Sequence, residues 1–424
     1  MSGLIKKISS HPLIDTLIHV KGNQRACLLT EPLWGIPFNL YAPFVAVYMA
    51  ALGMEPVTIG ITATVFLISQ MVWALLGGVL TDKMGRRLCT LVFDILAWSV
   101  PALIWMLAQN FHWFLAAAII NGTWRVTENA WALLYVEDAP ENKLVHLYSL
   151  AHIAGLIAAF VTPIPYFFMQ NDSVVPTVRF LYGLTFVMMT AKFIILYIFT
   201  HETEVGRRRQ EESRHRNIFA HLLDSRHVLV TMLKTPRVMI TVGLLACIGA
   251  IRSVNDTFWP LLVTEKLGIG EKYLSVFATL RSLIMLAGYF LLVPRLSVRL
   301  FKKPLLVSLL CLGAVQGMLI FLWQGAFPLL IFGTVTEALA LSALIPLANS
   351  LQMVNIDREE RARMNALFLS MCLLITSPTG VLAGLLSEAD RSLPFVLTFC
   401  LTALAIFLSL KLWKNRQEEE DAPV

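Results

Sequence analysis

Eight ionisable side chains lie inside long apolar segments of this 424-residue chain. Burying a charge in apolar surroundings is unfavourable unless the charge is paired or hydrogen-bonded. Such side chains therefore pair with one another or take part in chemistry, in which a carboxyl binds and releases a proton and a guanidinium binds an anionic group. The eight residues are Asp94, Arg125, Glu128, Lys192, Arg252, Asp256, Arg281 and Glu337.

Arg281 and Glu337 have no opposite charge within one helical turn of their own segments. At 1.5 Å per residue they lie about 14 and 15 Å into these segments, close to the middle. We expect Glu337 to be a proton-carrying carboxyl, and Arg281 to bind a substrate carboxylate or to act as a gating partner. The alternative is that these two side chains simply pair with each other.

Four of the other charges can pair within a single helix. Arg125 and Glu128 are spaced i, i+3, and Arg252 and Asp256 are spaced i, i+4, so each pair lies on one helix face. Local pairing and ligand binding both remain open for these four residues.

Asp94 and Lys192 are expected to be structural, with Lys192 extending its ammonium group toward the membrane surface. Three tryptophans flank the charged positions, and we expect them to wall a cavity, although packing and interfacial anchoring explain most membrane tryptophans. They are Trp124, Trp131 and Trp259.

The elements that position these side chains are membrane helices. The chain is 57% hydrophobic and only 15% charged, with a mean hydropathy of +0.69. Helices of roughly 20 apolar residues cross a bilayer, and the sequence contains twelve such runs. They cover residues 32–51, 57–80, 88–108, 112–136, 147–169, 179–200, 237–262, 272–293, 304–323, 327–351, 364–386 and 392–413. The predicted fold class is an all-α membrane protein with twelve transmembrane helices.

Basic residues predict the orientation. With the N-terminus inside, 26 of the 34 Lys and Arg residues fall in cytoplasmic segments, as the retention of positive charge on that side requires. We expect both termini to be cytoplasmic, in the plasma (cytoplasmic) membrane of a bacterium. Contact with lipid explains the basic cluster in residues 207–216, so no nucleic-acid partner is expected.

The chain looks internally duplicated. Leu52-Gly53 matches Leu267-Gly268 and Thr162-Pro163 matches Ser377-Pro378, both at an offset of 215. Paired halves of this kind are found in secondary transporters. The predicted organisation is a cytoplasmic N-terminal segment at 1–31, a six-helix bundle at 32–200, a cytoplasmic linker with an amphipathic helix at 201–236, a second six-helix bundle at 237–413 and a cytoplasmic tail at 414–424. An amphipathic surface segment and a solvated terminus both remain open for residues 1–31.

The stretch GGVLTDKMGRR, residues 77–87, places a polar turn after the second apolar run. It resembles the signature G-x-x-x-D-[RK]-x-G-[RK]-[RK] of the major facilitator superfamily, and the resemblance extends over roughly residues 30–413. The second copy, at 294–303, keeps only the basic residues. The matching positions are Gly78, Asp82, Lys83, Gly85, Arg86 and Arg87.

This resemblance implies two pseudo-symmetric six-helix bundles around a central cavity, lined most closely by the first, fourth, seventh and tenth helices. It also implies that Asp82 faces the helix that starts near residue 364, and pairs with Arg86 and with an acidic residue ending the fourth helix, for which Asp138 fits. That cluster would form a cytoplasmic gate. We further expect Gly78 to allow close helix approach and Gly85 to support a tight turn. Topology-determining charges are the simpler alternative for the basic residues.

The sequence thus predicts a secondary transporter of a small polar or amphipathic solute, working by alternating access and coupled to protons through Glu337 or Glu128. An ion-independent facilitator and a multidrug efflux protein are the alternatives, and a non-transporting sensor or scaffold with the same fold is a different class. The fourth helix has Ala118 where many exporters of the family have Arg, which disfavours drug/proton antiport. We expect a monomer that is not an enzyme, with no cofactor, metal site or disulfide.

Overall fold

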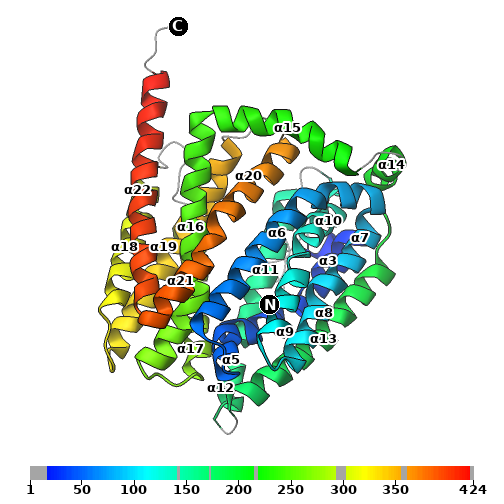
Figure 1. Ribbon diagram of the computed structural model, residues 1–424. Coiled ribbons are helices and arrows are strands. Elements are labelled where there is room, and N and C mark those ends of the chain that lie inside the picture. The colour runs from blue at the N-terminus through cyan, green and yellow to red at the C-terminus, as the bar shows by residue number, and fades with distance from the viewer. Residues whose placement is uncertain are drawn as a thin grey trace, which may run out of the picture.

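A computed structural model describes residues 17–140, 144–170, 173–213, 218–292, 302–354 and 361–420. All regular secondary structure in these ranges is helical (Figure 1), so the prediction of an all-helical fold is confirmed there. Residues 1–16 of the expected N-terminal segment, most of the second motif copy at 294–303 and residues 421–424 of the tail lie outside the described residues.

The helices follow the apolar runs of the sequence. Those before the linker are α3 (Gly22–Thr30), α4 (Pro32–Tyr41), α5 (Val45–Ala51), α6 (Pro56–Met84), α7 (Arg86–Asp94), α8 (Val100–Leu107), α9 (Phe111–Asn121), α10 (Trp124–Val136), α11 (Leu144–Ala158), α12 (Ile164–Phe168) and α13 (Val174–Phe199). The linker holds α14 (Glu204–Ser213) and α15 (Ile218–Lys234). After it come α16 (Pro236–Leu261), α17 (Tyr273–Leu291), α18 (Lys302–Ile320), α19 (Phe327–Val354), α20 (Arg361–Thr376), α21 (Pro378–Ala389) and α22 (Leu393–Glu420).

Eleven helical stretches of the described chain are long and apolar enough to cross a membrane. The expected span 112–136 differs, because it is divided into α9 and α10. The Ser69 hydroxyl of α6 donates a hydrogen bond to the Ile119 carbonyl at 2.6 Å, and the Thr123 N–H turns to the Ile120 carbonyl instead. A side chain inserted into the helical hydrogen-bond ladder is a known cause of such breaks.

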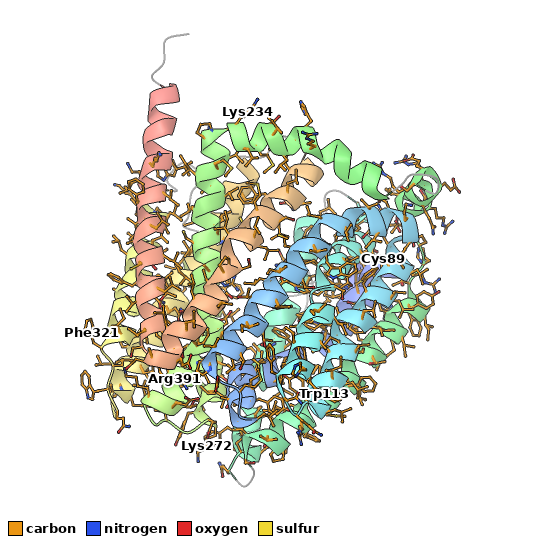
Figure 2. The ribbon with its side chains drawn as sticks, in the orientation of Figure 1. Cys89, Trp113, Lys234, Lys272, Phe321 and Arg391 are labelled. Atoms are coloured by element: carbon orange, nitrogen blue, oxygen red, sulfur yellow. The ribbon has the colours of Figure 1, made fainter. Side chains whose placement is uncertain are left out.

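The helices before the linker pack mainly with one another, as do those after it. We call these two groups the N half and the C half. Figure 1 shows α15 running across one end of the molecule from α16 toward α14, and we call this the linker end. In Figure 2, Lys234 marks the linker end, while Trp113, Lys272 and Arg391 lie toward the opposite end, called here the far end.

The two halves are in close contact at the far end. There α6 crosses α21 so closely that a Cβ on Gly60 would overlap the carbonyl of Gly380, and one on Gly384 would overlap that of Pro56. Next to this crossing, the Thr64 hydroxyl donates to the Ser377 carbonyl at 2.7 Å. Glycine lets two helices approach in this way because it has no side chain.

Candidate functional site

Arg281 lies between two carboxylates in the middle of the C half. Its guanidinium nitrogens lie 3.5 Å from the Asp256 carboxylate on α16 and 3.7 Å from the Glu337 carboxylate on α19. The three helices α16, α17 and α19 thus bring together residues that are far apart in sequence. Pairing of Arg281 with Glu337 was one of the two alternatives left open by the sequence.

The two carboxylates have different surroundings. The Glu337 side chain is 7% exposed and the Asp256 side chain 58% exposed. Glu337 also accepts a hydrogen bond of 2.9 Å from the buried amide of Asn255. A single guanidinium therefore contacts one carboxylate shielded from solvent and one open to it.

Arg252 and Asp256 do not form the local pair that their spacing allows. Asp256 contacts Arg281 instead, and Arg252 is exposed, with no ion pair or hydrogen bond to any residue that the structure describes. The i, i+4 spacing permits a pair but does not fix the side-chain rotamers, so a partner on another helix can replace the local one.

A second charged cluster lies in the N half. Arg125 pairs with Glu128 at 2.8 Å, as the spacing allows, and donates to the Gln70 side chain of α6 at 3.0 Å. Its guanidinium stacks over the Trp124 ring, 3.9 Å from the ring centre. The Glu128 carboxylate is open to solvent, as that of Asp256 is, because the Glu128 side chain is 51% exposed.

Lys192 does not extend to the membrane surface as expected. Its ammonium pairs with Glu31 at 2.9 Å, and the side chain is only 5% exposed. It lies between the rings of Trp34 and Trp131, 5.8 and 5.7 Å from the ring centres. Lys192 therefore joins α13 to the start of the first span.

The remaining positions pack inside the two halves. The buried Asp94 carboxylate accepts a hydrogen bond from Thr127 at 2.7 Å. Trp131 stacks on Tyr135, and Trp259 packs edge-on against Phe277 with ring centres 5.5 Å apart.

The motif residues form an ion-pair network at the linker end. Arg86 pairs with Asp82 at 2.8 Å, and with Glu137 rather than the expected Asp138 at 3.0 Å. Asp138 is exposed in the turn that follows α10, whereas the Glu137 side chain before it is largely buried against Arg86. Glu202 completes the network, because its carboxylate accepts hydrogen bonds from the backbone N–H groups of Arg86 and Arg87.

One further expectation for the motif needs correction, and one stays open. A Cβ on Gly78 would meet no atom, whereas one on Gly77 would contact the α10 backbone, so Gly77 is the residue at the close approach. In the described residues, Asp82 forms an ion pair with Arg86. The side chains just before residue 364 lie outside the described part of the chain, so the expected contact of Asp82 with that helix stays a prediction. Gly85 has a φ of +80°, as a tight turn requires.

Sequence reasoning missed five polar residues of these clusters. Three of them are glutamates at the ends of apolar runs, where charged residues are common: Glu31, Glu137 and Glu202. The other two carry uncharged amide side chains, which a search for charge inside apolar runs does not detect. Only the tertiary contacts identify Gln70 and Asn255. No group of His, Cys, Asp and Glu that could hold a metal occurs in the described part of the chain.

Comparison with known proteins gives family and fold. The model of the Major Facilitator Superfamily matches residues 34–254 and 241–423. The quinolone resistance protein NorA of Staphylococcus aureus is 29% identical over 84 residues, so the chain matches only 21% of the length of that relative and 20% of its own. The nucleoside transporter NupG superposes with a TM-score of 0.71 at 12% identity, covering 93% of this chain and 100% of NupG. A D-xylose-proton symporter superposes with a TM-score of 0.70 at 16% identity, covering 92% of this chain and 97% of the symporter.

Proposed function

Because this chain belongs to the major facilitator superfamily, we propose that it is a secondary transporter that moves a small polar or amphipathic solute by alternating access, coupled to protons through Glu337. The observation that carries the coupling is the position of Arg281 between the buried Glu337 and the exposed Asp256. A proton on Glu337 removes one of the two negative charges that Arg281 contacts. Protonation therefore changes the partner of a cation at the centre of the C half.

Coupling requires that the proton favour one orientation of the transporter over the other. The close contact of the halves at the far end, where Gly60 of α6 lies against Gly380 of α21, supports an orientation that is closed at that end. Reorientation would separate Gly60 from Gly380 and bring Asp82 to α20.

The remaining details are part of the same proposal. Twelve spans in two bundles, at 32–200 and 237–413, place the linker and both termini on the cytoplasmic side of a bacterial membrane, as the 26 Lys and Arg residues there favour. One such chain suffices as a monomeric pathway. Multidrug efflux is the second candidate function, favoured by the partial match to NorA.

The test measures reorientation without needing a substrate. Spin labels on Glu55 and Glu388 report the far end, and labels on Leu88 and Ser350 report the linker end, in a background with Cys400 replaced by Ser. We expect both distance distributions to shift between pH 8 and pH 5.5, in opposite directions, and the shift to be absent in Glu337→Gln. Glu128→Gln tests the other carboxyl that the sequence allows as the proton carrier, and we expect this variant to keep the response to pH because Glu128 is an exposed carboxyl of the other half. Distances that ignore pH, or respond equally in Glu337→Gln, contradict coupling through Glu337.

A further inference from the structure

Arg252 and Asp256 present two opposite charges to solvent, one turn apart on α16. Arg252 is 16 residues from Pro236 and 14 from Lys266, about 24 and 21 Å along the helical axis and so near the centre of the span. An exposed Arg at that depth is unfavourable toward lipid. In the described residues its guanidinium forms no ion pair or hydrogen bond and is near only the uncharged Tyr289 hydroxyl, so this charge and the exposed Asp256 carboxylate are both accessible to a charged ligand.

The face that carries these two side chains is turned toward the interior of the transporter. One turn before Arg252, the position of Gly249 lies against the Thr376 hydroxyl of α20. One turn after it, Asp256 contacts Arg281 of α17. The helix α16 also touches α5 and α6 of the N half. Arg252 therefore lies on a face bordered by α17 and α20, on a helix that also contacts the N half.

We infer that this face binds a zwitterionic solute, with its carboxylate on Arg252 and its ammonium group on Asp256. A solute with only a negative charge would pair with Arg252 but would be repelled by Asp256 one turn away. A solute with only a positive charge would pair with Asp256 but would be repelled by Arg252. A molecule with both charges a few ångströms apart satisfies both residues, which fits solutes from a free amino acid to a short peptide. This inference rests on the proposed transport function and names its substrate class.

The same geometry gives the sense of coupling. An ammonium on Asp256 competes with Arg281 for that carboxylate, so Arg281 shifts toward Glu337 and favours its ionised form. Protonation of Glu337 has the opposite effect: Arg281 then pairs with Asp256, which makes this carboxylate less available to the ammonium group of the solute. Solute and proton thus oppose each other's binding, which is the logic of exchange. The titratable groups at this depth on helices packed around Glu337 are Arg252, Asp256, Arg281, Tyr289 and Cys311.

The experiment is a thermal-shift titration of the purified full chain in detergent at pH 6 and pH 8. The probes are the amino acids and their alanyl dipeptides, each with its N-acetylated and C-amidated derivative, which lose one charge and keep the side chain. We expect at least one zwitterion to stabilise the protein, its two derivatives to bind at least about tenfold more weakly, and binding to weaken at pH 6.

The variants assign the two ends of the ligand. Arg252→Gln should lose the preference for a free carboxylate and Asp256→Asn the preference for a free ammonium, while Arg252→Lys retains part of the former. Glu337→Gln, which resembles the protonated state, should bind weakly at both pH values. Lack of stabilisation by any zwitterion, or equal binding of the derivatives, overturns the inference. The spin-label response to pH needs no ligand, so it separates this failure from a failure of the transport proposal.

Discussion

Arg86 at the start of α7 pairs with Glu137 and not with its neighbour Asp138. Its buried guanidinium contacts the Glu137 carboxylate at 3.0 Å and the Asp82 carboxylate at 2.8 Å. Glu137 is itself held by the Thr203 hydroxyl at 2.6 Å. One cation thus joins the ends of α6, α7 and α10 to the segment that leads into α14.

We expect replacement of Glu137 to be far more damaging than replacement of Asp138. Glu137→Gln removes one of the two carboxylates that the buried Arg86 guanidinium contacts, and loss of a hydrogen bond to a charged group costs about 1.5–3 kcal/mol. Asp138→Asn changes an exposed side chain and should stay within about 0.5 kcal/mol. Thermal unfolding of the two variants in detergent decides between them, and equal melting temperatures would contradict the pairing.

The crossing of α6 and α21 gives a prediction about the far end. Gly60→Ala and Gly380→Ala place a methyl group against backbone atoms of the opposite half, so the halves must separate there. Spin labels on Glu55 and Glu388 should report a longer distance than in the wild type. Gly155→Ala is the control, since a Cβ at that position meets no neighbour, and an unchanged distance in all three variants would show that the crossing tolerates side chains.

Much of the architecture can be predicted from the sequence because lipid imposes it. Backbone groups in hydrocarbon must bond internally, so the long apolar runs are largely helical where the structure describes them, and eleven stretches there are long enough to span. The break between α9 and α10 was missed, because the Ser69 hydroxyl that causes it comes from another helix.

The candidate site was only partly predictable for the same reason. A charged residue inside an apolar run can be recognised from the sequence alone, and this criterion identified both Arg281 and Glu337. The ion-pair partner of each charge depends on which helices are neighbours. The sequence suggested that Arg252 pairs with Asp256 and that Arg86 pairs with Asp138, but in the folded protein Asp256 pairs with Arg281 and Arg86 pairs with Glu137.

Lys192 and Glu31 allow a double-mutant test of buried charge. Lys192→Met leaves the Glu31 carboxylate without its cation, and Glu31→Gln leaves the Lys192 ammonium without its carboxylate. Each single change should therefore lower the free energy of unfolding by about 3–5 kcal/mol. The double variant removes both charges of this pair and should be more stable than the sum of the singles implies. Thermal unfolding of the four proteins gives the coupling, and strictly additive losses would contradict a direct pair.

Asp390 gives a pH prediction at the far end. The Lys266 ammonium donates to its carboxylate at 2.7 Å and the Ser392 N–H also donates, which lowers the pKa of Asp390 below its ordinary value. The ionised form is therefore favoured by folding, and its contribution is present above about pH 4 and is lost as the pH falls below that value. Because the side chain is half-exposed, the effect is small.

Asp390→Asn should therefore melt slightly below the wild type at pH 7, and this difference should shrink between pH 5 and pH 3. Glu388→Gln is the matched control, since Glu388 is an exposed carboxyl two residues away with no ion pair to any described residue. Its difference from the wild type should stay close to zero across the range. A gap between Asp390→Asn and the wild type that is as large at pH 3 as at pH 7 would mean that the Asp390 charge does not stabilise the fold, and that Lys266 is held by the Ser392 hydroxyl instead.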